Sequence, residues 1–440
     1  MGPEWIAIIA LVALFVAGTV LPINMGALAY VAAWFVGVFA LHMDEKEVLG
    51  GISADLVLTL IGVTYLFSIA KNNGTVDLIV SKAVQAVGGR VALIPWVMFA
   101  VTALLTAIGA ASPAACAVIG PVALGFARRY KINPLMMGMF VVHGAQGGGF
   151  SPISIYGTIT NSVMADVGYE GTEMGVFIAS LAINTAMAVI LFLALGGRQL
   201  MRERVDPAEA AGHIADDLHT GGQSVTVSGQ GASVSTTTRA LGVRRDHVLT
   251  LVAFAAVATT ALAFDQNIGF VSITAAVALA MLSPQQHKDA VKQIAWPTVL
   301  LVAGVSTYAT VLNAAGSPEY IGTWAAGLGI AAIGALVLCY VGGIVSAFAS
   351  STALLPVIIP IAVPLIVGGG VSPWAMAAAL AVSSTIVDVS PFSTNGALML
   401  ANRPDTISEQ AYYKQILNYA IIVTLAGPLL VWGILVLPGW

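Results

Sequence analysis

Several stretches of this sequence run for about 18 residues or more without a charged side chain, the length expected of a transmembrane helix. Thr298 to Ala315 and Tyr419 to Pro438 are two examples. A helix of that length crosses a hydrocarbon layer about 30 Å thick, and a globular core does not need it. Only 9% of the 440 residues are charged, whereas soluble domains have about 25%. We therefore expect a polytopic α-helical membrane protein.

The two cysteines, Cys116 and Cys339, lie inside apolar stretches and are interpreted as small packing residues. The sequence shows neither a cluster with metal-ligand spacing nor a disulfide framework. No basic residue precedes the first apolar run. Residues 5–21 are therefore interpreted as a retained span rather than a cleavable signal peptide.

A polar segment divides the chain into two apolar halves. It is charged at first and then rich in Gly, Ser and Thr from residue 221 to 238, a composition typical of linkers. A small extramembrane module is the alternative, but the segment has few large apolar residues for a core. We predict a first repeat over residues 1–199, a polar linker over 200–245 and a second repeat over 246–440.

The two halves share a pattern that indicates internal duplication. The motif Ser-Pro-x-Ser-x-x-Gly occurs at residues 151–157 and again at 390–396. Landmarks that recur in the same order along both halves favour duplication over chance. Further matches are Ser112 with Ser351, Pro121 with Pro360, Pro134 with Pro373, and Gly62 with Gly304.

Each half is predicted to contain the same elements in the same order. These are three spans, a short amphipathic helix, a broken apolar pair, a long span interrupted at Ser-Pro, and a final span. In the first half they cover residues 5–21, 24–41, 55–70, 75–88, 91–130, 134–165 and 173–196. In the second half they cover residues 248–264, 267–283, 297–315, 317–328, 330–367, 373–402 and 415–437.

The broken apolar pair of each half fits either two full spans or one re-entrant hairpin. With hairpins, each half crosses the membrane five times, and the second half is inverted relative to the first. Every lysine and arginine except Lys46 then falls on the side of the central linker. This asymmetry matches the positive-inside rule and favours hairpins. It predicts a multi-pass protein of the bacterial inner membrane, with a cytoplasmic linker and two periplasmic termini.

Backbone breaks inside a bilayer survive only where they line a cavity, because lipid cannot hydrogen-bond the freed groups. Each half has two candidate breaks, the Ser-Pro motif and a polar hairpin tip, at 109–113 and 349–352. Helix N-termini at such breaks offer N–H groups to an anion, whereas freed carbonyls and hydroxyls suit Na⁺. A single Ser-Pro would be interpreted as a kink. The same heptad in both repeats, each time in a half with a polar tip, favours function.

Asp388 is the only acidic residue predicted deep inside a span, so it is a functional candidate. The alternative is a structural acceptor for the neighbouring break. His143 and Gln146 lie on the approach to the first break, where a lone histidine is more often a packing residue. No lysine or arginine is predicted at mid-membrane. An anionic substrate would therefore depend on dipoles, hydroxyls and co-bound cations.

These features resemble the ion transporter superfamily, and divalent anion/sodium symporters in particular. Residues 350–352, Ser-Ser-Thr, look like the second Ser-Asn-Thr hairpin tip of that family. Residues 111–113, Ala-Ser-Pro, are a weaker match to the first tip, and the Ser-Pro breaks stand in place of Thr-Pro segments. Bacterial malonate/dicarboxylate carriers are a closer match. The segments that carry this second resemblance are 22–29, 93–99 and 143–157.

The resemblance implies a homodimer that works by an elevator mechanism. The polar breaks all fall in residues 91–165 and 330–402, which we expect to form the mobile domain, with the other spans as a dimerising scaffold. The predicted function is Na⁺-coupled import of a small dicarboxylate, malonate first. Alternatives are a proton-coupled carrier, a cation or oxyanion exporter of the same superfamily, and a channel.

An enzyme would need a nucleophile–base pair or metal ligands at one depth, and the sequence offers none, so no catalytic residue is predicted. It also has no ATP-binding motif, so an ion gradient is the expected energy source. A nucleic-acid partner is not expected. The candidate substrate-binding residues are Ser112, Gln146, Ser154, Ser351, Thr352, Ser393, Thr394 and Asn395.

Two or more Na⁺ ions are expected to neutralise the dianion, one at each pair of hairpin tip and break. Ser112, Gly149 and Ser151 are expected to line the first ion site. Ser351, Asp388 and Ser390 are expected to line the second. The carboxylate of Asp388 leaves an alternative, in which it carries a proton and transport is proton-coupled.

Overall fold

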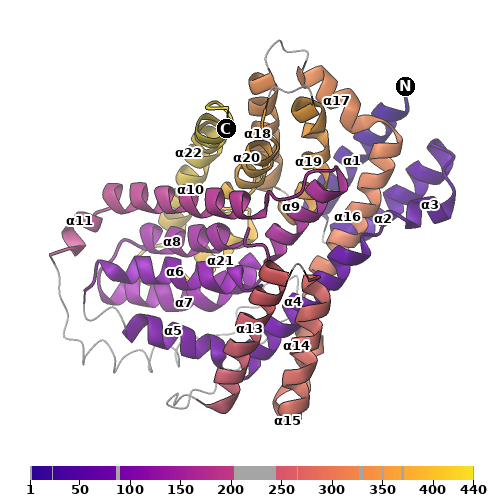
Figure 1. Ribbon diagram of the computed structural model, residues 1–440. Coiled ribbons are helices and arrows are strands. Elements are labelled where there is room, and N and C mark those ends of the chain that lie inside the picture. The colour runs from indigo at the N-terminus through magenta and orange to yellow at the C-terminus, as the bar shows by residue number, and fades with distance from the viewer. Residues whose placement is uncertain are drawn as a thin grey trace.

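The computed structural model describes residues 2–21, 23–85, 90–202, 244–264, 266–326, 331–348, 351–367 and 371–439. Most of the predicted linker lies outside the described residues, as do residues 349 and 350 of the second hairpin tip. The described residues form helices joined by short connections (Figure 1). The predicted all-helical architecture is therefore confirmed.

The first half contains eleven helices and one π-helical segment in the described residues. They are α1 (Pro3–Val20), α2 (Met25–Trp34), η1 (Phe35–Ala40), α3 (Glu45–Leu49), α4 (Ala54–Asn72), α5 (Thr75–Gln85), α6 (Leu93–Ala107), α7 (Ser112–Arg129), α8 (Pro134–Gly148), α9 (Ile155–Asp166), α10 (Glu173–Ala194) and α11 (Gly197–Leu200). The predicted hairpin corresponds to α6 and α7, and the interrupted span corresponds to α8 and α9.

The second half repeats this order. It contains α13 (Arg245–Phe264), α14 (Ile268–Leu282), α15 (Pro284–His287), η2 (Ala290–Gln293), α16 (Trp296–Ala314), α17 (Ser317–Ala326), α18 (Ala331–Phe348), α19 (Ser351–Val367), α20 (Pro373–Ile386), α21 (Thr394–Ala401) and α22 (Glu409–Leu435). Here α18 and α19 form the hairpin, and α20 and α21 form the interrupted span.

Several of these helices start next to a side chain that caps the helix N-terminus. Asn24 accepts hydrogen bonds from the N–H groups of the first turn of α2, and Asn267 does the same for α14 in the second half. Asn133 caps α8, whose first residue is Pro134. Asn accepts from backbone N–H groups that have no partner inside the helix, and proline at the first position loses no hydrogen bond. Equivalent caps in both halves support the duplication.

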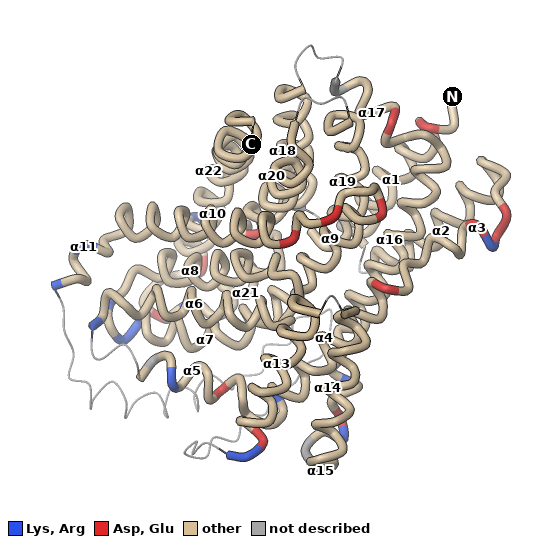
Figure 2. The backbone as a smooth tube through the Cα atoms, viewed as in Figure 1, with Lys and Arg blue, Asp and Glu red and all other residues tan. Residues whose placement is uncertain are grey.

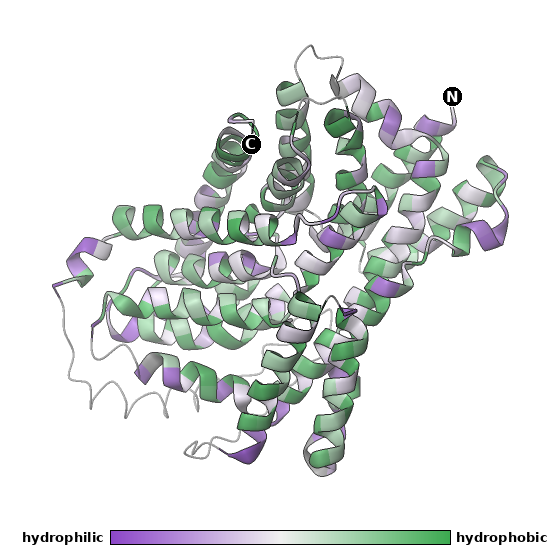
Figure 3. Ribbon diagram, in the orientation of Figure 1, coloured by the Kyte–Doolittle hydropathy of each residue, from purple (hydrophilic) through white to green (hydrophobic). Residues whose placement is uncertain are grey.

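Five helical stretches in the described residues are long and apolar enough to cross a membrane. Most of the helical ribbon is coloured as hydrophobic, whereas the strongly hydrophilic residues lie mainly at helix ends and connections (Figure 3). This distribution fits a multi-pass membrane protein. The five stretches are Glu45–Asn72, Glu173–Ala194, Arg245–Phe264, Trp296–Ala314 and Glu409–Leu435.

The helices pack into two bodies (Figure 1). In the first, called the scaffold, α2 packs on α16 and α1, and α4 packs on α14 and α16. In the second, called the hairpin body, each hairpin packs on the first part of the interrupted span of its own half. The amphipathic helices α5 and α17 each contact both bodies.

The last span of each half does not pack as predicted. We expected α10 and α22 to belong to the scaffold, but α10 packs against α8 and α20, and α22 packs against α18 and α20. The apolar pattern of these spans predicts a buried face without saying which helices cover it. The hairpin body therefore comprises α6–α10 and α18–α22.

In the scaffold, helices of the first half pack against helices of the second half. Gly26 of α2 and Gly304 of α16 face each other so closely that a Cβ on Gly304 would lie 2.1 Å from the Gly26 carbonyl oxygen. Gly62 of α4 and Gly269 of α14 make the corresponding close approach, where a Cβ on Gly62 would lie 2.6 Å from the Gly269 carbonyl oxygen. Helices approach this closely in membranes when small residues line the contact.

Basic side chains gather on one side of the molecule (Figure 2). Lys71, Arg128 and Arg129 lie in the last turns of α4 and α7, and Arg245 begins α13. Lys46 lies apart from them, with the acidic residues of α3. The distribution agrees with the asymmetry from which the topology was predicted.

Replacing Gly304 by alanine should destabilise the protein by about 1–3 kcal/mol, because the added methyl group has no room against α2. The matched control is Gly433→Ala in α22, where a Cβ would meet nothing within 4 Å. That variant should be neutral or slightly stabilising, because alanine favours helix. Thermal unfolding of the purified variants measures both. Equal midpoints would contradict the close packing of α2 and α16.

Candidate functional site

The first break separates α8 from α9, and Ser154 closes it. The Ser154 hydroxyl reaches the carbonyl oxygens of Gly149 and, at 2.6 Å, Ser151. Its oxygen accepts the N–H of Gly157 at 3.2 Å. One buried side chain thus satisfies backbone groups that the missing helical turn leaves free.

The second break, between α20 and α21, is closed in the same way by Ser393. Its hydroxyl reaches the carbonyl oxygens of Asp388 at 2.9 Å and Ser390 at 2.8 Å. Its oxygen accepts the N–H of Gly396 at 3.2 Å. The two halves therefore repeat the same hydrogen bonds, atom for atom.

This geometry explains the repeated motif. A Cβ on Gly157 or on Gly396 would lie 1.9 or 2.0 Å from the carbonyl oxygen of the first serine of its motif, so only glycine fits. The second serine, Ser154 or Ser393, donates to the break itself. The predicted binding residues Ser154 and Ser393 are thus engaged in holding the breaks.

Each hairpin tip meets the break of the opposite half. Asn395, at the start of α21, donates its Nδ2–H to the Ser112 hydroxyl at the start of α7, at 3.0 Å. Thr352, near the start of α19, lies beside Tyr156 at the start of α9, and α19 packs on α9. Tyr156 and Asn395 occupy the same position of the repeated motif. The breaks and tips therefore converge from both halves on one buried centre.

Asp388 lies at this centre and is 8% exposed. Its Oδ2 accepts the hydroxyl of Ser351 at 2.8 Å, and Ser351 is also 2.8 Å from the Ser346 hydroxyl. Ser390 donates to the carbonyl oxygen of Ala347 at 3.3 Å. Within the described ranges, no lysine or arginine forms an ion pair with Asp388. The three residues predicted for the second ion site thus surround the same tip.

The residues predicted for the first ion site are arranged differently. Ser112 hydrogen bonds with Asn395, whereas the carbonyl oxygens of Gly149 and Ser151 accept from Ser154. Gly149 stands where the second half has Asp388, so this break offers no carboxylate. The two predicted ion sites are therefore chemically unequal.

Gln146 and His143 differ in their surroundings, although both are completely buried. In the described part of the chain, neither amide atom of Gln146 has a hydrogen-bond partner. Both ring nitrogens of His143 are bonded, Nδ1 to Asn184 at 2.8 Å and Nε2 to the Tyr419 hydroxyl at 2.6 Å. His143 therefore links α8 to α10 and α22, whereas Gln146 keeps its hydrogen-bonding capacity free in the core.

Thr394 is exposed and lies outside the buried group. Tyr156 and Ser346 also lie at this centre but were not predicted from the sequence. The motif contained a signal for Tyr156, because it aligns with Asn395, which was a predicted substrate-binding residue. No pattern marked Ser346, which belongs to the helix before the second tip.

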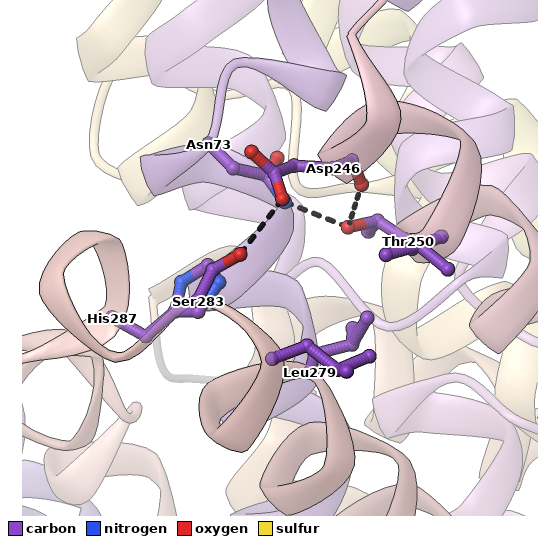
Figure 4. A pocket seen from close by; sticks show the side chains of 8 residues that line it. Asn73, Asp246, Thr250, Leu279, Ser283 and His287 are labelled. Carbon is purple, nitrogen blue, oxygen red and sulfur yellow. Dashed lines mark hydrogen bonds between the residues drawn. The ribbon is translucent and has the colours of Figure 1, made fainter.

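A separate polar pocket lies between α4, α13, α14 and α15 (Figure 4). Asn73 donates to Thr250 at 2.7 Å, and Ser283 donates to Asp246 at 2.8 Å. Burial lowers the pKa of His287, and the nearby Asp246 opposes that shift. The first bond joins the two halves, and the second joins α13 to the end of α14 within the second half. Both lie far along the chain from the breaks.

Comparison with known protein families agrees with the resemblance noted in the sequence. Residues 1–149 match the family model described as dicarboxylate carrier protein MatC N-terminus. No curated protein matches the chain significantly.

Two solved structures are similar over nearly the whole chain. The Alcanivorax borkumensis YdaH transporter, whose topology is described as unusual, is 13% identical with a TM-score of 0.56, and the match covers 98% of both chains. Neisseria gonorrhoeae MtrF is described as illuminating a class of antimetabolite efflux pumps. It is 12% identical with a TM-score of 0.57, and the match covers 98% of this chain and 94% of MtrF. Residues 1–149 therefore match the dicarboxylate carrier family that the resemblance predicted, and the whole chain has a fold shared with these membrane transporters.

Proposed function

We propose that the protein is a secondary active transporter that imports a small dicarboxylate, malonate first, in symport with Na⁺. The observation that carries this proposal is the buried centre where two hairpin tips meet two broken helices, with Asp388 as its carboxylate. Irregular backbone at membrane depth is typical of transporter binding sites. The family match of residues 1–149 supports a dicarboxylate as the cargo.

Charge balance supports coupling to cations. Two substrate carboxylates inside the membrane face a severe desolvation cost unless they are compensated. Asp388 adds a further negative charge, and in the described residues no basic side chain pairs with it. Hydroxyls and helix dipoles supply only partial charges. Cations that enter with the substrate would supply the rest.

Proton coupling is the second candidate, and the burial of Asp388 favours it. A carboxylate next to a single hydroxyl partner in a low-dielectric interior can be neutralised by a proton as well as by Na⁺. In both cases the ion binds where the second hairpin meets its break. The two mechanisms differ in which gradient drives uptake.

Uptake into proteoliposomes separates these mechanisms. An inward Na⁺ gradient at fixed pH should drive accumulation of radiolabelled malonate, and replacement of Na⁺ by choline should abolish it. Protein-free liposomes are the control. Uptake that follows only the pH gradient would reject sodium coupling and favour the proton. Absence of dicarboxylate uptake under either gradient would reject the proposed function.

The two packing bodies support an elevator mechanism, in which the hairpin body moves against the scaffold. The mobile body then includes α10 and α22 as well as the hairpins and broken helices. The scaffold would form a homodimer through its exposed apolar helices, for example α13, where Leu251, Val252 and Leu262 are exposed.

Cross-linking tests this division. A disulfide between cysteines at Val305 of α16 and Val357 of α19, which belong to one buried cluster, should arrest uptake because it joins the two bodies. The control pair replaces Gly175 of α10 and Trp374 of α20 within the hairpin body, where a Cβ on Gly175 would lie 4.0 Å from the Trp374 Cβ. Cross-linking that pair should leave most uptake intact. Equal effects of both cross-links would contradict a rigid-body movement.

We also propose that both termini are periplasmic and the central linker is cytoplasmic, because basic side chains gather around the ends of α4 and α7 and the start of α13. A reporter that is active only in the cytoplasm should then be active within the linker and silent when fused after Trp440. The opposite activities would invert the topology.

A further inference from the structure

The two tip–break pairs are related by the repeat, but their chemistry differs at three aligned positions. Gly149, Pro113 and Tyr156 of the first half correspond to Asp388, Thr352 and Asn395 of the second. The two breaks share their backbone hydrogen bonds. The side chains at these aligned positions differ, so the two tips present different groups to a ligand.

The second tip presents mainly oxygen acceptors. Asp388 provides a carboxylate, and the hydroxyls of Ser346 and Ser351 lie next to it at hydrogen-bond distance of each other. Among the described residues, no positively charged group pairs with this carboxylate. Carboxylate and hydroxyl oxygens are hard ligands, which suit hard cations.

The first tip presents hydrogen-bond donors. Helix α7 has 18 residues, begins at Ser112 and has no side-chain cap, so the positive end of its dipole faces the tip. Asn395 places its amide against the Ser112 hydroxyl. The break of the same half contributes Gly149 and no carboxylate.

Asn395 also has an unused group, which is the second observation at this tip. The residue is 2% exposed, and its Oδ1 has no hydrogen-bond partner among the residues that the structure describes. Turning the amide over lets Ser112 donate to Oδ1 and leaves both Nδ2–H donors for a ligand. A buried amide left half-satisfied beside an uncapped helix start suits a carboxylate group.

We infer that the tips have divided their roles: the second tip, with Ser351 and Asp388, holds one monovalent cation, and the first tip, with Ser112 and Asn395, holds a carboxylate of the substrate. This inference rests on the proposed function and places the cation of this centre at the second tip alone, instead of one cation at each tip.

Ligand-induced thermal stabilisation of the purified full-length protein tests the division. Three titrations are needed: NaCl at fixed pH, pH without Na⁺, and malonate at saturating cation. Asp388→Asn and Ser351→Ala should weaken or abolish the response to the cation, at least tenfold. Asn395→Ala and Ser112→Ala should weaken the malonate response at least tenfold and leave the cation response unchanged. Ser68→Ala, which removes a hydroxyl bonded within α4, is the control.

The outcomes separate the inference from the proposed function. A cation response that is lost equally in Asn395→Ala and in Asp388→Asn would overturn the division of roles. If the wild type responds to Na⁺ alone, Na⁺ is the cation, and if it responds only to pH, the proton is. A cation response without any dicarboxylate response would reject the proposed substrate while leaving the second tip as a cation site.

Discussion

The structure depends on one constraint, which is that a helix interrupted inside an apolar environment must still satisfy its backbone. Ser154 and Ser393 meet this constraint with identical hydrogen bonds, and Gly157 and Gly396 leave the room that those bonds need. The breaks would otherwise leave carbonyl and N–H groups unpaired in the core. Once the backbone is satisfied locally, the side chains around it are free to differ between the two halves.

A second consequence of the repeat is that each half depends on the other for packing contacts and hydrogen bonds. Gly26 packs against Gly304, Gly62 packs against Gly269, and Ser112 hydrogen bonds with Asn395. Each of these contacts joins a residue of the first half to a residue of the second half. Folding therefore requires both repeats, and the central site exists only where they meet. A displacement of the hairpin body would carry both tips and both breaks together, because they share contacts across the halves.

Much of this fold was predictable because membrane helices are specified by long apolar runs and local caps. The expected spans agree with the observed helices to within a few residues, as in α4 and α16, and the Ser-Pro breaks fall where the motif placed them. Partners distant along the chain were not predictable. His143 meets Tyr419, and Ser112 meets Asn395 rather than the break of its own half. Aligning the repeats placed each tip beside its own break, which agrees with the bond between Ser351 and Asp388. An alignment has no information on how the halves cross in space, so it did not predict the bond between Asn395 and Ser112. The same limitation assigned α10 and α22 to the wrong body.

Duplication gave the two breaks the same backbone geometry, and later divergence gave their surroundings different side chains. Positions that hold the breaks, such as Ser154 and Ser393, are identical, whereas the position of Gly149 and Asp388 differs in formal charge. A single carboxylate placed on one side of a nearly symmetric centre creates an electric field that points from one tip toward the other. In the proposed mechanism, a dianion bound between the tips would be repelled by Asp388 unless a cation separated them, so substrate and cation would favour each other's binding. Coupling then follows from electrostatics at one residue, without a separate element to transmit it.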